Sequence, residues 1–156
     1  MQSNTPDNYQ GKINLIKGIL EDVKNKKQAH YKCFSHYKKI NTVVKSVVNA
    51  LNAVSVCSMV LTFTPVSPAI MIVALSATSI STVASAVHSS TDIEGKVHSN
   101  NTSYLQYTDL YRDISARLLR NGMNSLDLDN LLTEINSRMG LIEDQSLPIK
   151  IKVVSP

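Results

Sequence analysis

The longest uncharged stretch of the chain, Ser46–Thr91, contains no Asp, Glu, Lys or Arg. A surface helix of a soluble protein keeps charged or polar residues on its outer face, where it meets water. A proline-containing turn over 64–68 divides the stretch into halves of about 20 residues, and such a length spans the apolar core of a bilayer. The pattern predicts a transmembrane helical hairpin, with helix 1 over 43–63 and helix 2 over 69–88.

Polar residues within this stretch leave a second interpretation open. The first half carries Asn49, Asn52 and Ser55, and the second half carries several Ser and Thr residues. A helical hairpin buried in a soluble bundle has such a composition, since short apolar runs are often core segments. We favour the membrane interpretation because both halves lack charge on every face. In a membrane, those three side chains are candidates for a polar lining.

Small residues recur at a spacing of four in the second half. One row comprises Ala74, Thr78, Thr82 and Ala86, and a second comprises Ala77, Ser81 and Ser85. Small residues at this spacing allow helix backbones to approach closely in a bilayer, and their hydroxyls can bond across the contact. The first row is therefore the predicted helix-packing face, against helix 1 or against a second copy of the chain.

The flanking segments carry helical patterns of their own. Ile13, Ile16, Leu20 and Val23 are spaced by three and four in an amphipathic basic helix over 6–42. The same helical phase continues into the first span, so one long helix can extend from about Asn8 to Phe63.

A heptad pattern predicts the next helix, over 91–121. Its seam comprises Ile93, Val97, Asn100, Tyr104, Tyr107, Tyr111, Ile114 and Leu118. We expect the three tyrosines to pack against the first helix near Phe34, Tyr37 and Ile40, and we prefer core packing to a ligand site.

Ser125 and Asp127 predict the start of a C-terminal helix over 126–145, which an extended tail over 146–156 follows. The expected fold is all-α, a single unit over 1–156.

Charge predicts the orientation in the membrane. Residues 1–45 hold nine lysines against three acids, whereas the 64–68 turn has no charge. The positive-inside rule then places both termini in the cytoplasm, or on the equivalent side of an internal membrane of a virion. The basic segment lacks the clustered aromatic groups of a nucleic-acid site, so nucleic acid is an unlikely partner.

Catalytic and cofactor motifs are absent from the sequence. His30, Cys33 and His36 are spaced too widely around a helix to hold one metal ion. We expect no enzyme activity, no cofactor and no metal.

The layout resembles one known family. The lysine-rich run before Val43, the hairpin, the helix with the sequence YLQYTDLYRDI and the ending LLTEINSRMGLIEDQSLPI are similar to SLATT proteins, the SMODS- and SLOG-associating two-transmembrane effectors. The resemblance covers roughly residues 25–149. It implies a protein that self-associates in the lipid bilayer, as a pore former under the control of a sensing partner. The alternative is a structural anchor within a larger assembly of neighbouring proteins, as a minor capsid protein of a large DNA virus would be.

Overall fold

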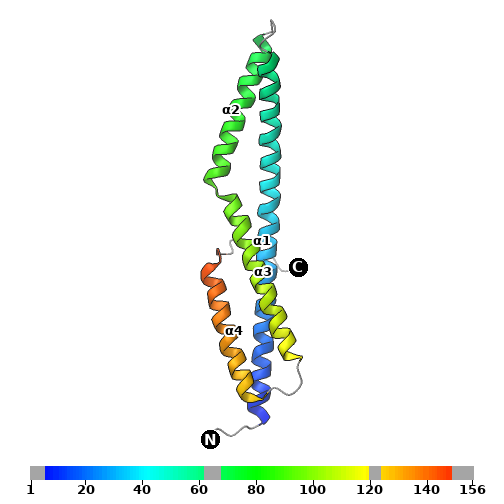
Figure 1. Ribbon diagram of the computed structural model, residues 1–156, viewed down its shortest axis with the longest axis vertical. Coiled ribbons are helices and arrows are strands. Elements are labelled where there is room, and N and C mark those ends of the chain that lie inside the picture. The colour runs from blue at the N-terminus through cyan, green and yellow to red at the C-terminus, as the bar shows by residue number, and fades with distance from the viewer. Residues whose placement is uncertain (1–5, 62–67, 120–123, 149–156) are drawn as a thin grey trace. The chain divides into compact units, whose positions relative to one another are not determined.

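The computed structural model describes residues 6–61, 68–119 and 124–148, and these residues form four α-helices with no strand among them. The helices are α1 (Pro6–Leu61), α2 (Pro68–Ser90), α3 (Ile93–Leu118) and α4 (Ser125–Gln145), as Figure 1 shows. The all-α fold class is confirmed. The basic helix over 6–42 and the first predicted span, as far as Leu61, are parts of one helix, α1; residues 62 and 63 of that span lie outside the described residues. Most of the predicted 64–68 turn and most of the tail lie outside the described residues.

The start of α4 differs in detail from the prediction. Asn124, and not Ser125, is the N-cap residue. The Asn124 side chain accepts a hydrogen bond from the Asp127 backbone N–H, and the Asp127 carboxylate accepts one from the Asn124 N–H. This capping box satisfies two donors at once, which a serine one position later cannot do. The Ser125 hydroxyl instead accepts a hydrogen bond from Lys12, at 2.8 Å.

The chain divides into two compact units, whereas the sequence predicts a single one. The terminal unit contains residues 1–34 and 98–156, and the central unit contains residues 35–97. The boundaries therefore fall within α1 and within α3.

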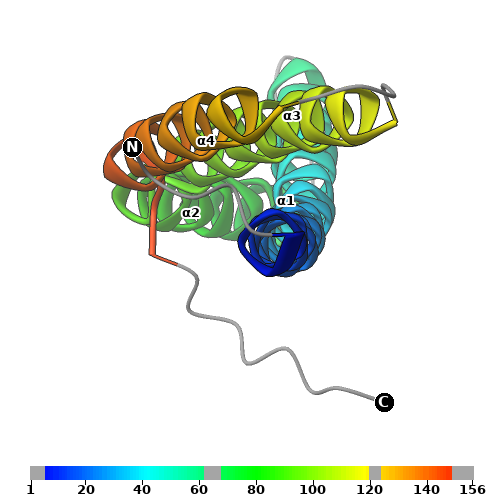
Figure 2. The ribbon, with the colours of Figure 1, turned by 90° about the horizontal axis from the view of Figure 1, so that it is seen from below.

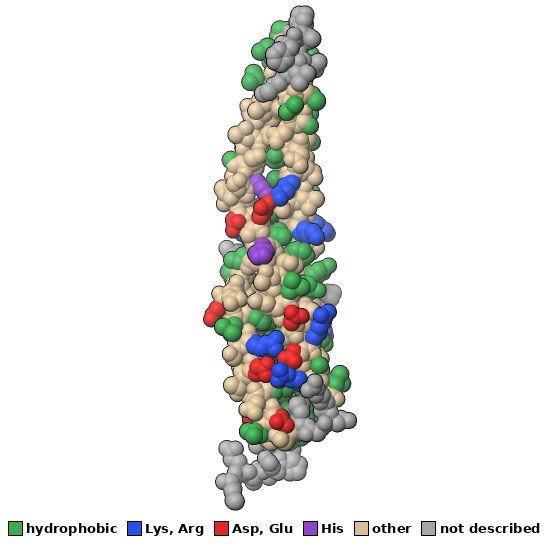
Figure 3. Space-filling model, viewed as in Figure 1, with side chains coloured by type: hydrophobic (Ala, Val, Ile, Leu, Met, Phe, Trp, Pro, Cys, Tyr) green, Lys and Arg blue, Asp and Glu red, His purple; other side chains and the backbone are tan. Residues whose placement is uncertain are grey.

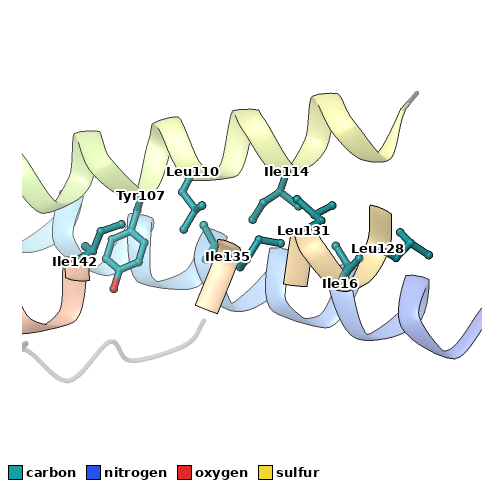
Figure 4. Packing of buried hydrophobic residues seen from close by; sticks show 9 residues of the cluster. Ile16, Tyr107, Leu110, Ile114, Leu128, Leu131, Ile135 and Ile142 are labelled. Carbon is teal, nitrogen blue, oxygen red and sulfur yellow. The ribbon is translucent and has the colours of Figure 1, made fainter. Parts of the chain in front are cut away.

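The terminal unit is a three-helix bundle. The first part of α1 lies beside α3 and α4, as Figures 1 and 2 both show. Its core is a cluster of aliphatic residues and one tyrosine, which come from all three helices (Figure 4). The buried members are Ile16, Val23, Tyr107, Leu110, Ile114, Leu128, Leu131, Ile135 and Ile142. Burial of this apolar surface stabilises the bundle through the hydrophobic effect.

Ion pairs connect the helices at the rim of this core. Arg117 donates to Glu134 at 2.7 Å and to Asp113 at 3.1 Å, while Arg138 donates to Asp113 at 2.7 Å. The Arg117–Glu134 and Arg138–Asp113 pairs join α3 to α4, and the Arg117–Asp113 pair lies within α3. Lys26 on α1 pairs with Glu143 on α4; burial lowers the pKa of Lys26, but hydrogen bonds to Glu143 and Asp22 more than offset this, so its pKa is raised.

The central unit consists of the second part of α1, helix α2 and the start of α3. Two hydrogen bonds fix how α1 and α2 pair: Ser55 with Thr78, and Asn52 with Ser81. Beyond them, Lys45 on α1 pairs with Glu94 at the start of α3. From Ser55 to Lys45 the residue numbers on α1 fall, while those of the partner residues rise from Thr78 to Glu94. The two segments are therefore antiparallel.

Candidate functional site

Small and polar side chains fill the contact between α1 and α2. Thr78 donates to the Ser55 hydroxyl at 3.1 Å, and Ser81 donates to the Asn52 side-chain oxygen at 2.6 Å. Ser55, Ser81 and Ala77 are buried, with exposed fractions of 4 to 7%. The two helices are therefore joined by hydrogen bonds across a contact of small residues, the arrangement typical of helix pairs in bilayers.

Large apolar side chains of the same unit point outward. Eleven of them are exposed: Val43, Val47, Val54, Val56, Met71, Ile72, Val73, Leu75, Ile80, Val83 and Val87. Leu75 and Ile72 are about two-thirds exposed, at 66% and 65%. On the face shown in Figure 3, no acidic or basic side chain lies over most of α2 and the part of α1 paired with it. So many exposed large apolar side chains within one uncharged region indicate a surface that another phase or molecule covers.

Two helices are long and apolar enough to cross a membrane, one within α1 and one that includes α2. Little of either apolar window is buried inside the protein, 6% for the first and 11% for the second. A core helix of a soluble protein passes the same test of length and composition but is mostly buried. The low burial therefore argues against the soluble-bundle alternative.

Three exposed hydroxyls in the middle of α2 are satisfied within their own helix. Ser76 donates to the Ile72 carbonyl at 2.7 Å, and Ser79 donates to the Leu75 carbonyl at 2.8 Å. Thr82 makes the equivalent bond to the carbonyl four residues earlier, at 2.9 Å. A hydroxyl paired in this way has its donor satisfied and needs no water. These three hydroxyls are thus compatible with an apolar solvent.

Asn49 differs from these hydroxyls. Its side chain is exposed, and it makes no hydrogen bond to any of the described residues. An amide carries two donors and an acceptor, and leaving them unpaired in an apolar medium is costly. If the central unit lies in lipid, Asn49 requires a polar partner outside this chain's described residues.

The charged residues of the central unit are confined to 38–45 and 92–96. Because α1 and α2 are antiparallel, both groups lie at the same end of the pair. Lys45 and Glu94 form an ion pair there at 2.5 Å, and the hydrogen bond from Lys45 lowers the pKa of the Glu94 carboxyl. Asp92 accepts a hydrogen bond from the Gly95 backbone N–H, and Lys96 donates to the Thr91 carbonyl. The unit therefore has one charged end and a long uncharged remainder.

His88 lies in the last turn of α2, near this charged end. Both of its ring nitrogens are shielded from solvent and lack a hydrogen-bond partner among the described residues. It borders a small surface hollow together with Ser89, Asp92, Ile93 and Glu94. The described residues contain no group of three His, Cys, Asp or Glu side chains that could hold a metal ion.

The three tyrosines of the heptad seam have different surroundings in the terminal unit. Tyr107 is almost fully buried and stacks on His30 at 5.6 Å, and burial raises the pKa of its hydroxyl. Tyr104 lies 5.3 Å from Tyr31, and Lys27 lies over the Tyr111 ring. The ring contacts of Tyr107 and Tyr104 are thus with His30 and Tyr31, about one turn earlier on α1 than the expected partners.

Asn100, the polar position of the seam, is buried and its side-chain oxygen lies 3.1 Å from His30 Nδ1. The position of either residue in its own helix does not predict this pair. Each helix does, however, carry one polar residue within its apolar seam, and buried polar groups need partners, so pairing the two polar positions would have predicted the contact.

The predicted packing row is divided by the structure. Ala74 and Thr78 are half-buried, and Thr78 bonds to Ser55 of α1, whereas Thr82 and Ala86 are exposed. The fully buried positions, Ala77 and Ser81, belong to the second row. Of the predicted polar lining, Ser55 and Asn52 bond to α2, and only Asn49 makes no bond to a described residue.

Neither cysteine forms a disulfide with a described residue: Cys33 is buried in the terminal unit and Cys57 is exposed in the central unit. No protein-family model, no curated protein and no solved structure matches this chain, so its function has to be argued from the two units themselves.

Proposed function

We propose that the protein is a non-enzymatic two-pass membrane protein. Its central unit crosses the bilayer as a helical hairpin, and the terminal unit is a water-exposed helical bundle on the cytoplasmic side. The observation that carries this proposal is the reversed polarity of the central unit, in which Ser55 and Ser81 are buried at the helix contact while large valine, leucine and isoleucine side chains are exposed. In water such an arrangement would expose its apolar surface, whereas in lipid it is favourable.

The length of the uncharged segment supports the same proposal. From Lys45 to Leu61, α1 contains enough residues to cover most of the ~30 Å apolar core at ~1.5 Å per residue. Helix α2, with 23 residues, covers all of it. The ion pair between Lys45 and Glu94 then lies at the cytoplasmic boundary of the apolar core, where charged groups can reach headgroups and water.

Self-association in the bilayer is the second part of the proposal. Its support is Asn49, whose exposed amide lies four residues inside the boundary marked by Lys45 and has no partner among the described residues. An asparagine in an apolar helix favours association, because a second copy can supply the missing hydrogen bonds. Together, these features resemble the layout of SLATT-type membrane effectors.

The structure supports a structural anchor as a second candidate, more than it supports a pore. Two of the three candidate lining residues, Asn52 and Ser55, are used in hydrogen bonds to α2. A water path between copies would have to be lined largely by other side chains. An anchor within a larger assembly needs only the hairpin and a bundle surface that neighbouring proteins can bind.

Extraction and flux assays test these proposals in order. The full chain, expressed in bacteria, should stay in the membrane pellet after alkaline carbonate treatment, and its release would contradict the two-pass proposal. A glycosylation acceptor placed at either terminus should stay unmodified in a eukaryotic membrane, and one in the 64–68 turn should be modified.

In liposomes that contain a trapped fluorescent dye, dye release proportional to the amount of protein would favour the pore. Retention of the dye in liposomes with stably inserted protein would favour the anchor.

A further inference from the structure

Two exposed lysines lie on one face of α1 at the charged end of the central unit. Lys38 and Lys39 are both exposed, and with Ser35, Thr42 and Val43 they border a surface hollow of about 470 Å³. These five residues are spaced by three, four, seven and eight positions, so they share one side of the helix. The Thr42 hydroxyl donates to the Lys38 carbonyl at 2.9 Å, so it is satisfied by the helix itself.

The sequence of α1 contains no Asp or Glu after Asp22. The acids of the central unit are Asp92 and Glu94, and Glu94 is already paired with Lys45. Lys39 forms no ion pair with any described residue. The face therefore has a local excess of positive charge directly beside the uncharged segment.

The same face continues into exposed apolar side chains. From Lys39, steps of four, four, three and four residues lead to Val43, Val47, Ala50 and Val54, all of them exposed. The valines along this stripe are between 45% and 61% exposed. A cationic group followed along the helix by an apolar stripe matches a phospholipid with an anionic headgroup, whose acyl chain lies parallel to the helix.

The depth of the lysines fits this assignment, which rests on the proposed two-pass insertion. If Lys45 marks the boundary of the apolar core, Lys39 lies six residues further out, which is ~9 Å along a helix. Headgroup layers occupy roughly 5–8 Å on each side of the core. The ammonium groups of Lys38 and Lys39 can therefore reach phosphate groups of the cytoplasmic leaflet.

We infer that Lys38 and Lys39, with the apolar stripe from Val43 to Val54, form a binding surface for an anionic phospholipid. A second copy of the chain is a poorer occupant of this face. A symmetric pair of copies joined here would bring lysines of both copies together, and such like-charge contacts destabilise an interface. An anionic lipid has the complementary charge, and each lysine near an anionic membrane surface strengthens binding by about fivefold or more.

The test uses the full chain, reconstituted into phosphatidylcholine vesicles with spin-labelled lipids. The electron spin resonance spectrum separates lipid immobilised at the protein from bulk lipid. Spin-labelled phosphatidylglycerol should associate several-fold more strongly than spin-labelled phosphatidylcholine, and added salt should reduce the difference. The double variant K38Q/K39Q should lose most of this preference.

A matched control removes the same charge from the terminal unit. The double variant K17Q/K24Q lacks two α1 lysines that do not belong to the proposed surface, and it should keep the preference of the parent protein. Carbonate-resistant insertion without any lipid preference, or an equal loss in both double variants, would overturn the lipid site while leaving two-pass insertion intact. Failure of the parent protein to insert would overturn the proposed function, and the lipid site with it. Competition by inorganic phosphate alone would show an anion site that does not recognise a lipid.

Discussion

The terminal and central units place polar and apolar residues in opposite ways, although α1 contributes to both. In the terminal unit, Ile16, Leu110 and Leu128 are fully buried, and ion pairs lie at the rim. In the central unit, Ser55 and Ser81 are buried, and Leu75 and Val83 are exposed. The difference teaches that helical periodicity alone does not identify which face of a helix is the inner one. The identity of the surrounding solvent decides it, because the apolar face follows the apolar phase.

The largest expected effect distinguishes a buried leucine from an exposed one. Leu110→Ala in the terminal unit removes fully buried apolar atoms and leaves a cavity, so it should reduce the free energy of unfolding by about 2–5 kcal/mol. Leu75→Ala in the central unit removes a side chain that contacts little of the protein and should leave stability nearly unchanged. Denaturant titration of the purified protein in detergent measures both. Equal losses from the two variants would mean that Leu75 is packed against protein and that the contrast between the units is wrong.

A smaller effect is expected at the α1–α2 contact. Ala77 is buried there, so Ala77→Leu should force the helices apart at a cost of about 1–3 kcal/mol. Ala86→Leu is the matched control, since Ala86 is exposed on the same helix. The unfolding temperatures of the two variants in detergent show which alanine matters for the pairing of α1 with α2 within one chain. A selective effect of Ala86→Leu on chemical cross-linking between copies would instead assign Ala86 to a contact between chains.

The ion pairs of the terminal unit predict a contribution to the free energy of unfolding that depends on salt concentration. Asp113 accepts hydrogen bonds from Arg117 and Arg138, and Asp113→Asn should cost about 0.5–1 kcal/mol, since all three side chains are about one-third exposed. High salt should shrink this cost through screening. The variant Ser81→Ala, in which the lost hydrogen bond lies in the central unit, should show no such dependence on salt. Denaturant titrations at low and high salt provide the comparison.

The smallest effect concerns pH at the charged end of the central unit. The hydrogen bond from Lys45 lowers the pKa of Glu94 below its ordinary value of 4.5. Because the folded pKa is the lower one, the stabilisation is complete above pH 4.5 and is lost as the pH falls through the folded value. Lys45→Gln should therefore lower the unfolding temperature slightly at neutral pH and not at all in strong acid. A difference that persists undiminished in acid would exclude the ion pair as its cause.

Sequence patterns predicted the elements better than the contacts. The uncharged stretch and the spacing of Ile13, Ile16 and Leu20 by three and four were sufficient to predict the helices, because each helix is long and strongly periodic. The cap of α4 was misassigned by one residue, since Asn124 and Ser125 are both good capping residues and only the reciprocal bond with Asp127 separates them.

The inner faces of the helix pair could not be assigned in this way. Two rows of small residues exist on α2, and their spacing is the same. Which row packs depends on the rotation of α2 about its axis, and hydrogen bonds from Ser81 to Asn52 and from Thr78 to Ser55 set that rotation. The pairing of His30 with Asn100 depends likewise on three-dimensional packing between residues far apart in sequence.

The central claim, that the exposed apolar face of the central unit meets lipid, is tested most directly with a spin label at position 75. The label is attached to Leu75→Cys, in a protein that also carries Cys33→Ala and Cys57→Ser, reconstituted into vesicles. A label at Leu105→Cys, about half-exposed in the terminal unit, is the reference. Oxygen concentrates in lipid and a nickel chelate stays in water, so collision rates with each report the surroundings of the label. We expect the label at position 75 to collide more with oxygen and the label at position 105 more with the chelate. Free access of the chelate to position 75 would contradict the account.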